Sequence, residues 1–140
     1  MILVDTNVVS EAMRPRPDLA VAAWFDAQPW DSLYLCTPVL AELRFGVEKL
    51  PEGRRKQVLA SAVDHIQNDL YGGRILSFDP HAATQYAVLA ATRQRQGRRI
   101  DPVDAFIAAI AAVHRATVAT RDVEGFLGMG IEVVNPFSLP

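Results

Sequence analysis

The chain has 140 residues, half of them hydrophobic and 21% of them charged, with a formal net charge of −2. This length suits one domain, expected over residues 1–140, that buries about two thirds of the surface of its unfolded chain. A net charge so near zero excludes a dedicated polyelectrolyte binder, so any contact with nucleic acid must come from local basic patches.

Cysteine content and hydropathy bear on the cellular compartment. The single cysteine, Cys36, permits no intrachain disulfide, which is compatible with a reducing cytoplasm. Asp5 interrupts the first apolar stretch and no basic segment precedes it, so we expect no signal peptide. No uncharged apolar run approaches the roughly 18 residues needed to cross a bilayer. We therefore expect a cytoplasmic protein without membrane contact.

The first half of the chain predicts strands and helices in alternation. Residues 2–4 form a short apolar run, typical of a strand buried on both faces, and a short helix follows over 8–13. Asp18 is placed to cap a helix that ends near residue 27. A second strand is expected over 33–36. Thr37 and Pro38 combine a hydroxyl N-cap with a proline at the first helical position, which predicts a helix from there to about residue 50.

The second half continues this alternation. Helices are expected at residues 54–70, 79–96 and 101–115, strands at 74–78, 117–120 and 131–134, and a short helical turn around 126–127. Strands that alternate with helices at these lengths indicate a parallel sheet covered on both faces. The sequence therefore predicts a three-layer α/β/α domain with a central parallel sheet of four to five strands.

Four carboxylates fall where the predicted strands end or the predicted helices begin. Asp5 and Asp122 each follow a strand, and Glu42 and Asp104 lie in the first turn or two of a helix. In a doubly wound sheet these places share the carboxyl edge of the strands. Four such charges repel one another, and a hard divalent cation with oxygen ligands, Mg²⁺ or Mn²⁺, would relieve the repulsion. The alternative for Asp5 is a purely structural helix cap.

Two further features have both a functional and a structural interpretation. The arginines Arg93, Arg95, Arg98 and Arg99 could bind a phosphate backbone, or could simply be a solvated helix end, where cations are favourable. Phe45 points away from the apolar stripe of its helix, which indicates either a subunit interface or an isolated exposed aromatic.

Four sequence blocks together resemble the PIN-domain ribonucleases, specifically the VapC toxin type and its FitB-like branch. They occur in the family's order and reach from the first residue to the C-terminal strands. The blocks are Met1 to Glu11, Ala41 to Gly46, Asp104 to Ala109 and Val118 to Asp122.

The resemblance implies an endoribonuclease that depends on Mg²⁺ or Mn²⁺ and is the toxin of a type II toxin–antitoxin pair. It implies a homodimer neutralised by a cognate antitoxin, with RNA as substrate and DNA contacted only through the antitoxin. Carried over by position, the catalytic acids are Asp5, Glu42, Asp104 and Asp122. Asp5, Asp104 and Asp122 would hold the metal, and Asn7 and Thr120 would support it.

Two other functions compete with this interpretation. The chain could be a PIN-like module that acts mainly as the partner of a DNA-binding antitoxin, with weak or no nuclease activity. A haloacid-dehalogenase-like phosphatase also begins with a strand-end Asp, but it needs a second Asp two positions later, where this chain has Asn7. It also needs a positioned lysine, and Lys49 and Lys56 follow no predicted strand.

Asp101 and Asp104 begin the same predicted helix and need to be separated. Pro102 suits the first helical position, which makes Asp101 the N-cap and Asp104 the third helical residue. An N-cap side chain turns back toward the helix's own free N–H groups, whereas the third residue points outward from the first turn. We therefore expect Asp101 to cap the helix and Asp104 to belong to the metal site.

Overall fold

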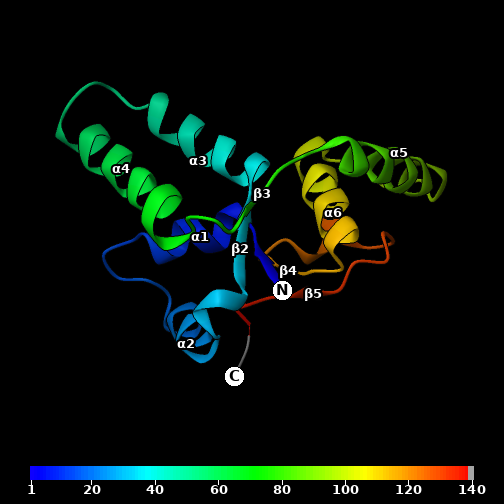
Figure 1. Ribbon diagram of the computed structural model, residues 1–140, viewed down its shortest axis with the longest axis horizontal. Helices are drawn as coiled ribbons and strands as arrows, with labels where there is room; N and C mark the ends of the chain where they lie inside the picture. Colours follow the sequence, from blue (N-terminus) through cyan, green and yellow to red (C-terminus); the bar gives the residue numbers. More distant parts are fainter. Residues whose placement is uncertain (139–140) are drawn as a thin grey trace.

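A computed structural model of the protein describes residues 1–138, and its centre is a sheet of five parallel strands (Figure 1). The strand order is β3-β2-β1-β4-β5. The strands are β1 Ile2–Val4, β2 Leu33–Cys36, β3 Ile75–Leu76, β4 Thr117–Ala119 and β5 Val133–Val134. The chain winds outward from β1 in one direction and then returns to its other side, so β1 and β4 form the topological switch point, where α/β proteins place their ligand sites.

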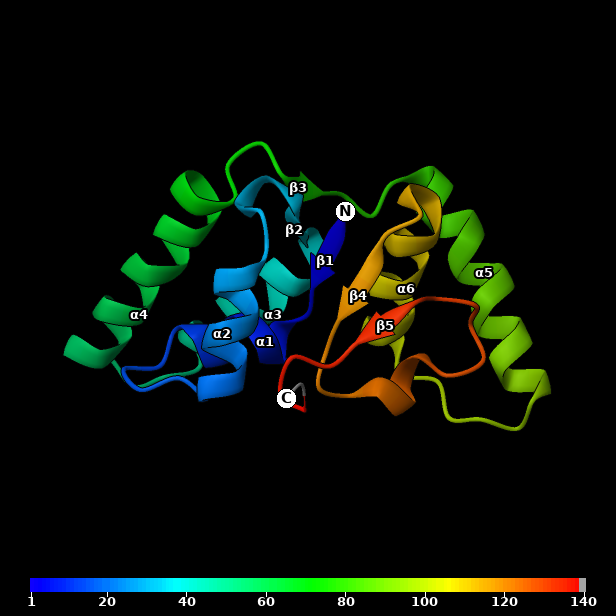
Figure 2. The ribbon, with the colours of Figure 1, turned by 90° about the horizontal axis from the view of Figure 1, so that it is seen from below.

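Six α-helices flank the sheet within residues 1–138, which confirms the predicted three-layer α/β/α fold. They are α1 Thr6–Ala12, α2 Leu19–Ala27, α3 Thr37–Glu48, α4 Arg54–His65, α5 Pro80–Arg95 and α6 Pro102–His114. Two 3₁₀ turns, η1 Trp30–Ser32 and η3 Val123–Phe126, and a π-helical turn, η2 Ile66–Leu70, complete the described elements. Helices α4 and α5 lie at opposite ends of the molecule in both views (Figures 1 and 2).

The core is deepest around the two central strands. Leu3 and Val4 of β1 and Val118 and Ala119 of β4 are all fully buried, as the continuous apolar runs predict. Helix α6 packs close to this centre because its buried face is built from small residues, among them Ala105, Ala108 and Ala109. The start of α6 is thereby fixed against the switch point. No helix within residues 1–138 is both long and apolar enough to cross a membrane.

The start of α3 differs from its prediction. Thr37 is already inside the helix and Cys36 occupies the N-cap position, without a side-chain capping bond. The Thr37 hydroxyl instead accepts a hydrogen bond from the backbone N–H of Phe78, at 3.2 Å. The hydroxyl therefore ties α3 to the segment that follows β3, a long-range contact that the local cap-and-proline pattern could not reveal.

The predicted helix over residues 54–70 is also different at its end. Its last turn, Ile66–Leu70, is π-helical, and the Tyr71 N–H bonds the Ile66 carbonyl at 2.9 Å. Gly72 comes directly after this turn and Tyr71. A Cβ at position 72 would lie 2.5 Å from the Asn68 carbonyl oxygen, so only glycine fits there without a backbone shift. The apolar spacing is compatible with both kinds of turn, which is why periodicity alone predicted a continuous α-helix.

Candidate active site

Asp5 lies directly after β1, at the switch point of the sheet. Its backbone N–H bonds the Ala119 carbonyl of β4 at 2.9 Å, and its side chain is only 4% exposed. One carboxylate oxygen accepts from the Thr6 N–H at 2.7 Å and the other from the Thr120 hydroxyl at 2.6 Å. Asp5 is thus the N-cap of α1, as the structural alternative predicted, and it is also a buried acid at the carboxyl edge of the central strands.

Burial raises the pKa of Asp5 above its ordinary value. The hydrogen bonds from Thr120 and Thr6 favour the charged form and lower this pKa, while the nearby charges of Glu42 and Asp122 raise it. Two acids from distant parts of the chain therefore lie within electrostatic range of Asp5.

Thr120 and Asn7 connect the ends of β1 and β4. The fully buried Thr120 donates its hydroxyl to Asp5 and accepts from the Asp122 N–H at 3.0 Å. The Asn7 side-chain carbonyl accepts from the Arg121 N–H at 3.1 Å. These bonds fix the backbone that carries Asp122 against the backbone that carries Asp5.

Glu42 reaches the site from α3 and is exposed to solvent. The Thr6 hydroxyl donates to its Oε1 at 2.5 Å. This role of Thr6 was not predicted from the sequence, although Thr6 lies between two predicted site residues, Asp5 and Asn7. The contact fixes one oxygen of Glu42 and leaves the other free of protein hydrogen bonds within residues 1–138.

Asp101 and Asp104 behave differently, as expected from the proline between them. Asp101 accepts from the N–H groups of Val103 at 2.9 Å and Asp104 at 3.1 Å, which confirms that it caps α6. The half-buried Asp104 projects toward the other acids. Its pKa rises to about 7 because of burial first, then the charges of Asp101, Asp5, Asp122 and Glu42. The topology has therefore gathered the four predicted acids within Coulombic range of one another.

A glycine lies between two of these acids. In η3, a Cβ on Gly125 would overlap the Asp104 Oδ2 and stand 3.1 Å from the Asp122 Oδ2. Both carboxylate oxygens therefore face the same small space beside Gly125. Nothing in the sequence distinguishes Gly125, since a glycine in a short helical turn is common.

The donor set fits a hard divalent cation in chemistry and only partly in geometry. Within the described part of the chain, no three Asp, Glu, His or Cys side chains lie close enough together to hold a metal ion. Mg²⁺, however, is usually bound by one or two carboxylates and keeps several waters. Asp104 and Asp122 meet beside Gly125 as such a pair, with Asp5 nearby as a third oxygen donor.

The arginine cluster divides into one buried and three exposed side chains. Arg93 is 6% exposed and donates to the carbonyls of Arg99 at 2.6 Å, Glu124 at 3.0 Å and Leu127. Its guanidinium therefore holds the η3 segment against the end of α5 and is not available to a phosphate backbone. Arg95, Arg98 and Arg99 are exposed.

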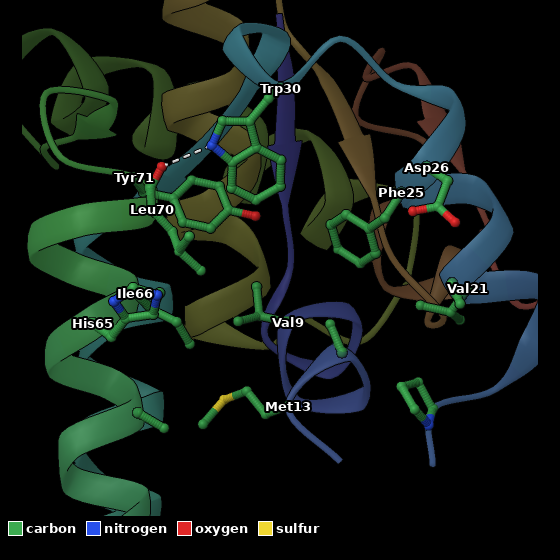
Figure 3. A pocket seen from close by; sticks show the side chains of 14 residues that line it. Val9, Met13, Val21, Phe25, Asp26, Trp30, His65, Ile66, Leu70 and Tyr71 are labelled. Atoms are coloured by element: carbon green, nitrogen blue, oxygen red, sulfur yellow. Dashed lines mark hydrogen bonds between the residues drawn. The ribbon is translucent and has the colours of Figure 1, made fainter. Parts of the chain in front are cut away.

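Two hollows lie among the helices α1 to α4. An apolar pocket of about 380 Å³ among α1, α2 and η2 contains none of the four acids, and Figure 3 shows Trp30, Tyr71, Phe25 and Met13 around it. A groove of about 780 Å³ between α1, α3 and α4 reaches Thr6 and Glu42. Only the groove therefore opens toward the acidic edge.

Comparison with known proteins agrees with this architecture. Residues 2–128 match the PIN domain. The VapC ribonuclease Y4jK of Sinorhizobium fredii is 41% identical over 137 residues, which cover 98% of each chain. The toxin FitB of Neisseria gonorrhoeae is 42% identical over 137 residues, covering 98% of this chain and 99% of that protein.

A solved structure extends the likeness to three dimensions. The crystal structure of FitAcB from Neisseria gonorrhoeae superimposes with a TM-score of 0.93 at 42% identity, covering 99% of this chain and 100% of that chain. Fold and sequence agree over almost the whole length. The chain therefore belongs to the PIN-domain family, in the branch that contains the VapC and FitB proteins.

Proposed function

We propose that the protein is an endoribonuclease dependent on Mg²⁺ or Mn²⁺ and that it is the toxin of a type II toxin–antitoxin pair. The observation that carries this proposal is the convergence of Asp5, Glu42, Asp104 and Asp122 at the switch point, expressed in the raised pKa of Asp104. The name of the Sinorhizobium relative, a VapC ribonuclease, supports RNA as the substrate.

Each acid has a distinct proposed role. Asp104 and Asp122 would hold the cation beside Gly125, with Asp5 as a buried third donor. A bound divalent cation would polarise the phosphodiester and lower the pKa of a water nucleophile. Glu42 is exposed and oriented by Thr6, so it is suited to accept a proton at the edge of the site. Asn7 and Thr120 would support the acids by fixing the two strand ends.

Three exposed arginines are the proposed contacts to RNA. Arg95, Arg98 and Arg99 lie at or beyond the end of α5, where cations also suit the helix terminus. Because phosphate contacts are electrostatic, triple replacement by alanine should weaken RNA binding and reduce its salt dependence. A variant with undiminished salt dependence would exclude this surface.

The metal requirement gives the decisive test of the proposed reaction. Purified protein, free of any partner, would be incubated with total RNA with and without Mg²⁺ or Mn²⁺, and Asp5→Asn would be the control. We expect cleavage to disappear with a chelator and to return with either cation. Full cleavage in excess chelator would overturn the proposed function.

A cognate antitoxin and a homodimer complete the proposal. The groove between α1, α3 and α4 opens beside Glu42, where an arginine from an antitoxin could pair with the acids. Phe45 on α3 is 67% exposed, which supports a second contact surface. We expect light scattering at micromolar concentration to give a dimer, and DNA to be bound only with the antitoxin present. A monomeric mass at that concentration would contradict the proposed homodimer.

The second candidate is a module that partners a DNA-binding antitoxin with little or no nuclease activity. The observation that favours it is that no three candidate metal ligands within residues 1–138 stand at binding distance. Absence of Mn²⁺ binding by calorimetry, together with retained antitoxin binding, would favour this candidate over the nuclease.

A further inference from the structure

Gly125 is placed where any side chain would enter the acidic site. It lies in η3, three residues after Asp122 and next to the buried Phe126. A Cβ there would overlap the Asp104 Oδ2 and come within 3.3 Å of the Asp104 Cγ and 3.1 Å of the Asp122 Oδ2. Two acids that are distant in sequence therefore share the volume that a methyl group at this position would fill.

We propose that Gly125 is a positioning residue of the metal site, because its missing side chain leaves the space into which Asp104 and Asp122 converge. This inference rests on the proposed function and adds to it a residue outside the four acids. Gly125 would act through the two carboxylates and not by contact with the substrate.

The need for glycine here is not a matter of backbone conformation. Gly128 and Gly130, a few residues later, have φ values of 79° and 68°, in the left-handed region that favours glycine. Gly125 is absent from the glycines with positive φ in the described chain, so an alanine could adopt its backbone. What bars the larger residue is the neighbouring pair of carboxylates.

The segment around Gly125 is also held from both sides. The Arg93 guanidinium donates to the carbonyls of Glu124 and Leu127, which flank Gly125. Phe126 is 2% exposed, and the Gly125 N–H bonds the Asp122 carbonyl at 3.2 Å and its side chain at 3.3 Å. Because the backbone is fixed, an added methyl group would be accommodated by the free end of the Asp104 side chain. The fold would survive and the carboxylate pair would separate.

Binding of Mn²⁺ to the metal-free protein, measured by titration calorimetry, tests this inference without any assay of cleavage. We expect Gly125→Ala to weaken Mn²⁺ binding by about 10- to 100-fold, the range seen when groups that orient metal ligands are changed. Gly46→Ala is the matched control, since Gly46 has an ordinary φ and nothing within 4 Å of its added Cβ. Far-ultraviolet circular dichroism would verify that each variant is folded.

A double-mutant cycle tests the contact itself. In the Asp104→Ala background the overlap with Asp104 is gone and only the 3.1 Å approach to the Asp122 Oδ2 remains, so Gly125→Ala should change the melting temperature little, or raise it by reducing the freedom of the unfolded chain. In the wild-type background the same change meets the Asp104 carboxylate and should be less favourable by a few degrees. If Gly125→Ala unfolds the wild type but not Asp104→Ala, the contact is supported as well.

The outcomes separate this inference from the proposed function. If the wild type binds Mn²⁺ and Gly125→Ala binds it equally well, the inference falls and the proposed function stands. If the wild type binds no Mn²⁺, the proposed function falls and this inference falls with it. If Gly125→Ala shifted the melting temperature equally in wild type and in Asp104→Ala, the added methyl group would not meet the Asp104 carboxylate, and the inference would lose its steric basis.

Discussion

The buried acid at the end of β1 and the acid at the start of α6 are held in opposite ways. Asp5 receives hydrogen bonds on both carboxylate oxygens, from Thr6 and Thr120. Asp104 receives none on its side chain from any residue within 1–138, and its pKa of about 7 reflects burial and four neighbouring charges. Asp5 is therefore a fixed point of the site, whereas we expect Asp104 to be the acid whose charge and position respond to a bound cation.

Removing either charge should have the largest effect on function. We expect Asp5→Asn and Asp104→Asn each to reduce RNA cleavage by more than about 100-fold, beyond the range found for groups that only orient ligands. The two variants would be compared with wild type in a single-turnover assay with Mn²⁺. If Asp104→Asn keeps wild-type activity while Asp101→Asn loses it, the assignment of these two residues is reversed.

The hydrogen bond from Thr120 to Asp5 should contribute measurably to the free energy of unfolding. Thr120→Val keeps the shape but removes the hydroxyl that donates to Asp5 and accepts from the Asp122 N–H. We expect a loss of about 1–3 kcal/mol in the free energy of unfolding, the usual cost of leaving buried polar groups without partners. It should also raise the pKa of Asp5 further, since the lowering bond is lost.

Chemical denaturation of wild type and Thr120→Ser separates the hydroxyl from its packing. Serine retains the hydrogen-bonding group and should recover most of the bonds, though not the buried methyl contact. If valine at position 120 proved as stable as threonine, Asp5 would not be the fixed point described above.

Titration of Asp104 should make the metal-free fold less stable as pH rises. Asp104 holds its proton up to about pH 7 in the folded protein, whereas its ordinary pKa is 3.8. Between these values the folded state binds more protons than the unfolded state, so stability falls through this window and levels off above it. Screening of a half-buried group limits the effect to about 1–2 kcal/mol, or roughly 3–8 °C in melting temperature.

Thermal unfolding from pH 4.5 to pH 8.5 in a chelator would measure this fall. Asp104→Asn has no such proton to lose, so its melting temperature should depend less on pH and exceed that of wild type at pH 8. Added Mn²⁺ should stabilise wild type most at high pH, where the carboxylate is charged. A wild-type slope equal to that of Asp104→Asn would show that Asp104 is not the titrating group.

How far the sequence predicted the site depends on whether the determining contacts are local. Asp18 and Asp101 cap their helices as expected, because a cap is decided within three or four residues. The parallel sheet followed from the alternation of apolar runs and helices. Thr37 was assigned wrongly because its partner, Phe78, is 41 residues away.

The same limit applies within the site. The order of the acids in the sequence and the rule for parallel sheets were enough to predict that they share one edge. The burial of Arg93 and the space beside Gly125 both depend on how the η3 segment packs against α5 and α6. No spacing in the sequence encodes that packing, so these two residues emerged only from the three-dimensional structure.

The smallest effects should come from Asp101, which lies three residues from Asp104 but does a different task. Asn caps helices about as well as Asp, so Asp101→Asn should change the free energy of unfolding by less than about 0.5 kcal/mol, whereas Asp101→Ala should cost about 1 kcal/mol.

Both variants remove the largest of the four charge contributions that raise the pKa of Asp104, so both should lower that pKa. Cleavage at neutral pH should be retained in Asp101→Asn, and carbon-13 NMR of the carboxyl groups would follow the titration. If the pKa of Asp104 stayed at about 7 in both variants, the Asp101 charge would contribute nothing to it, and the raised pKa would be due to burial and to the remaining charges of Asp5, Asp122 and Glu42.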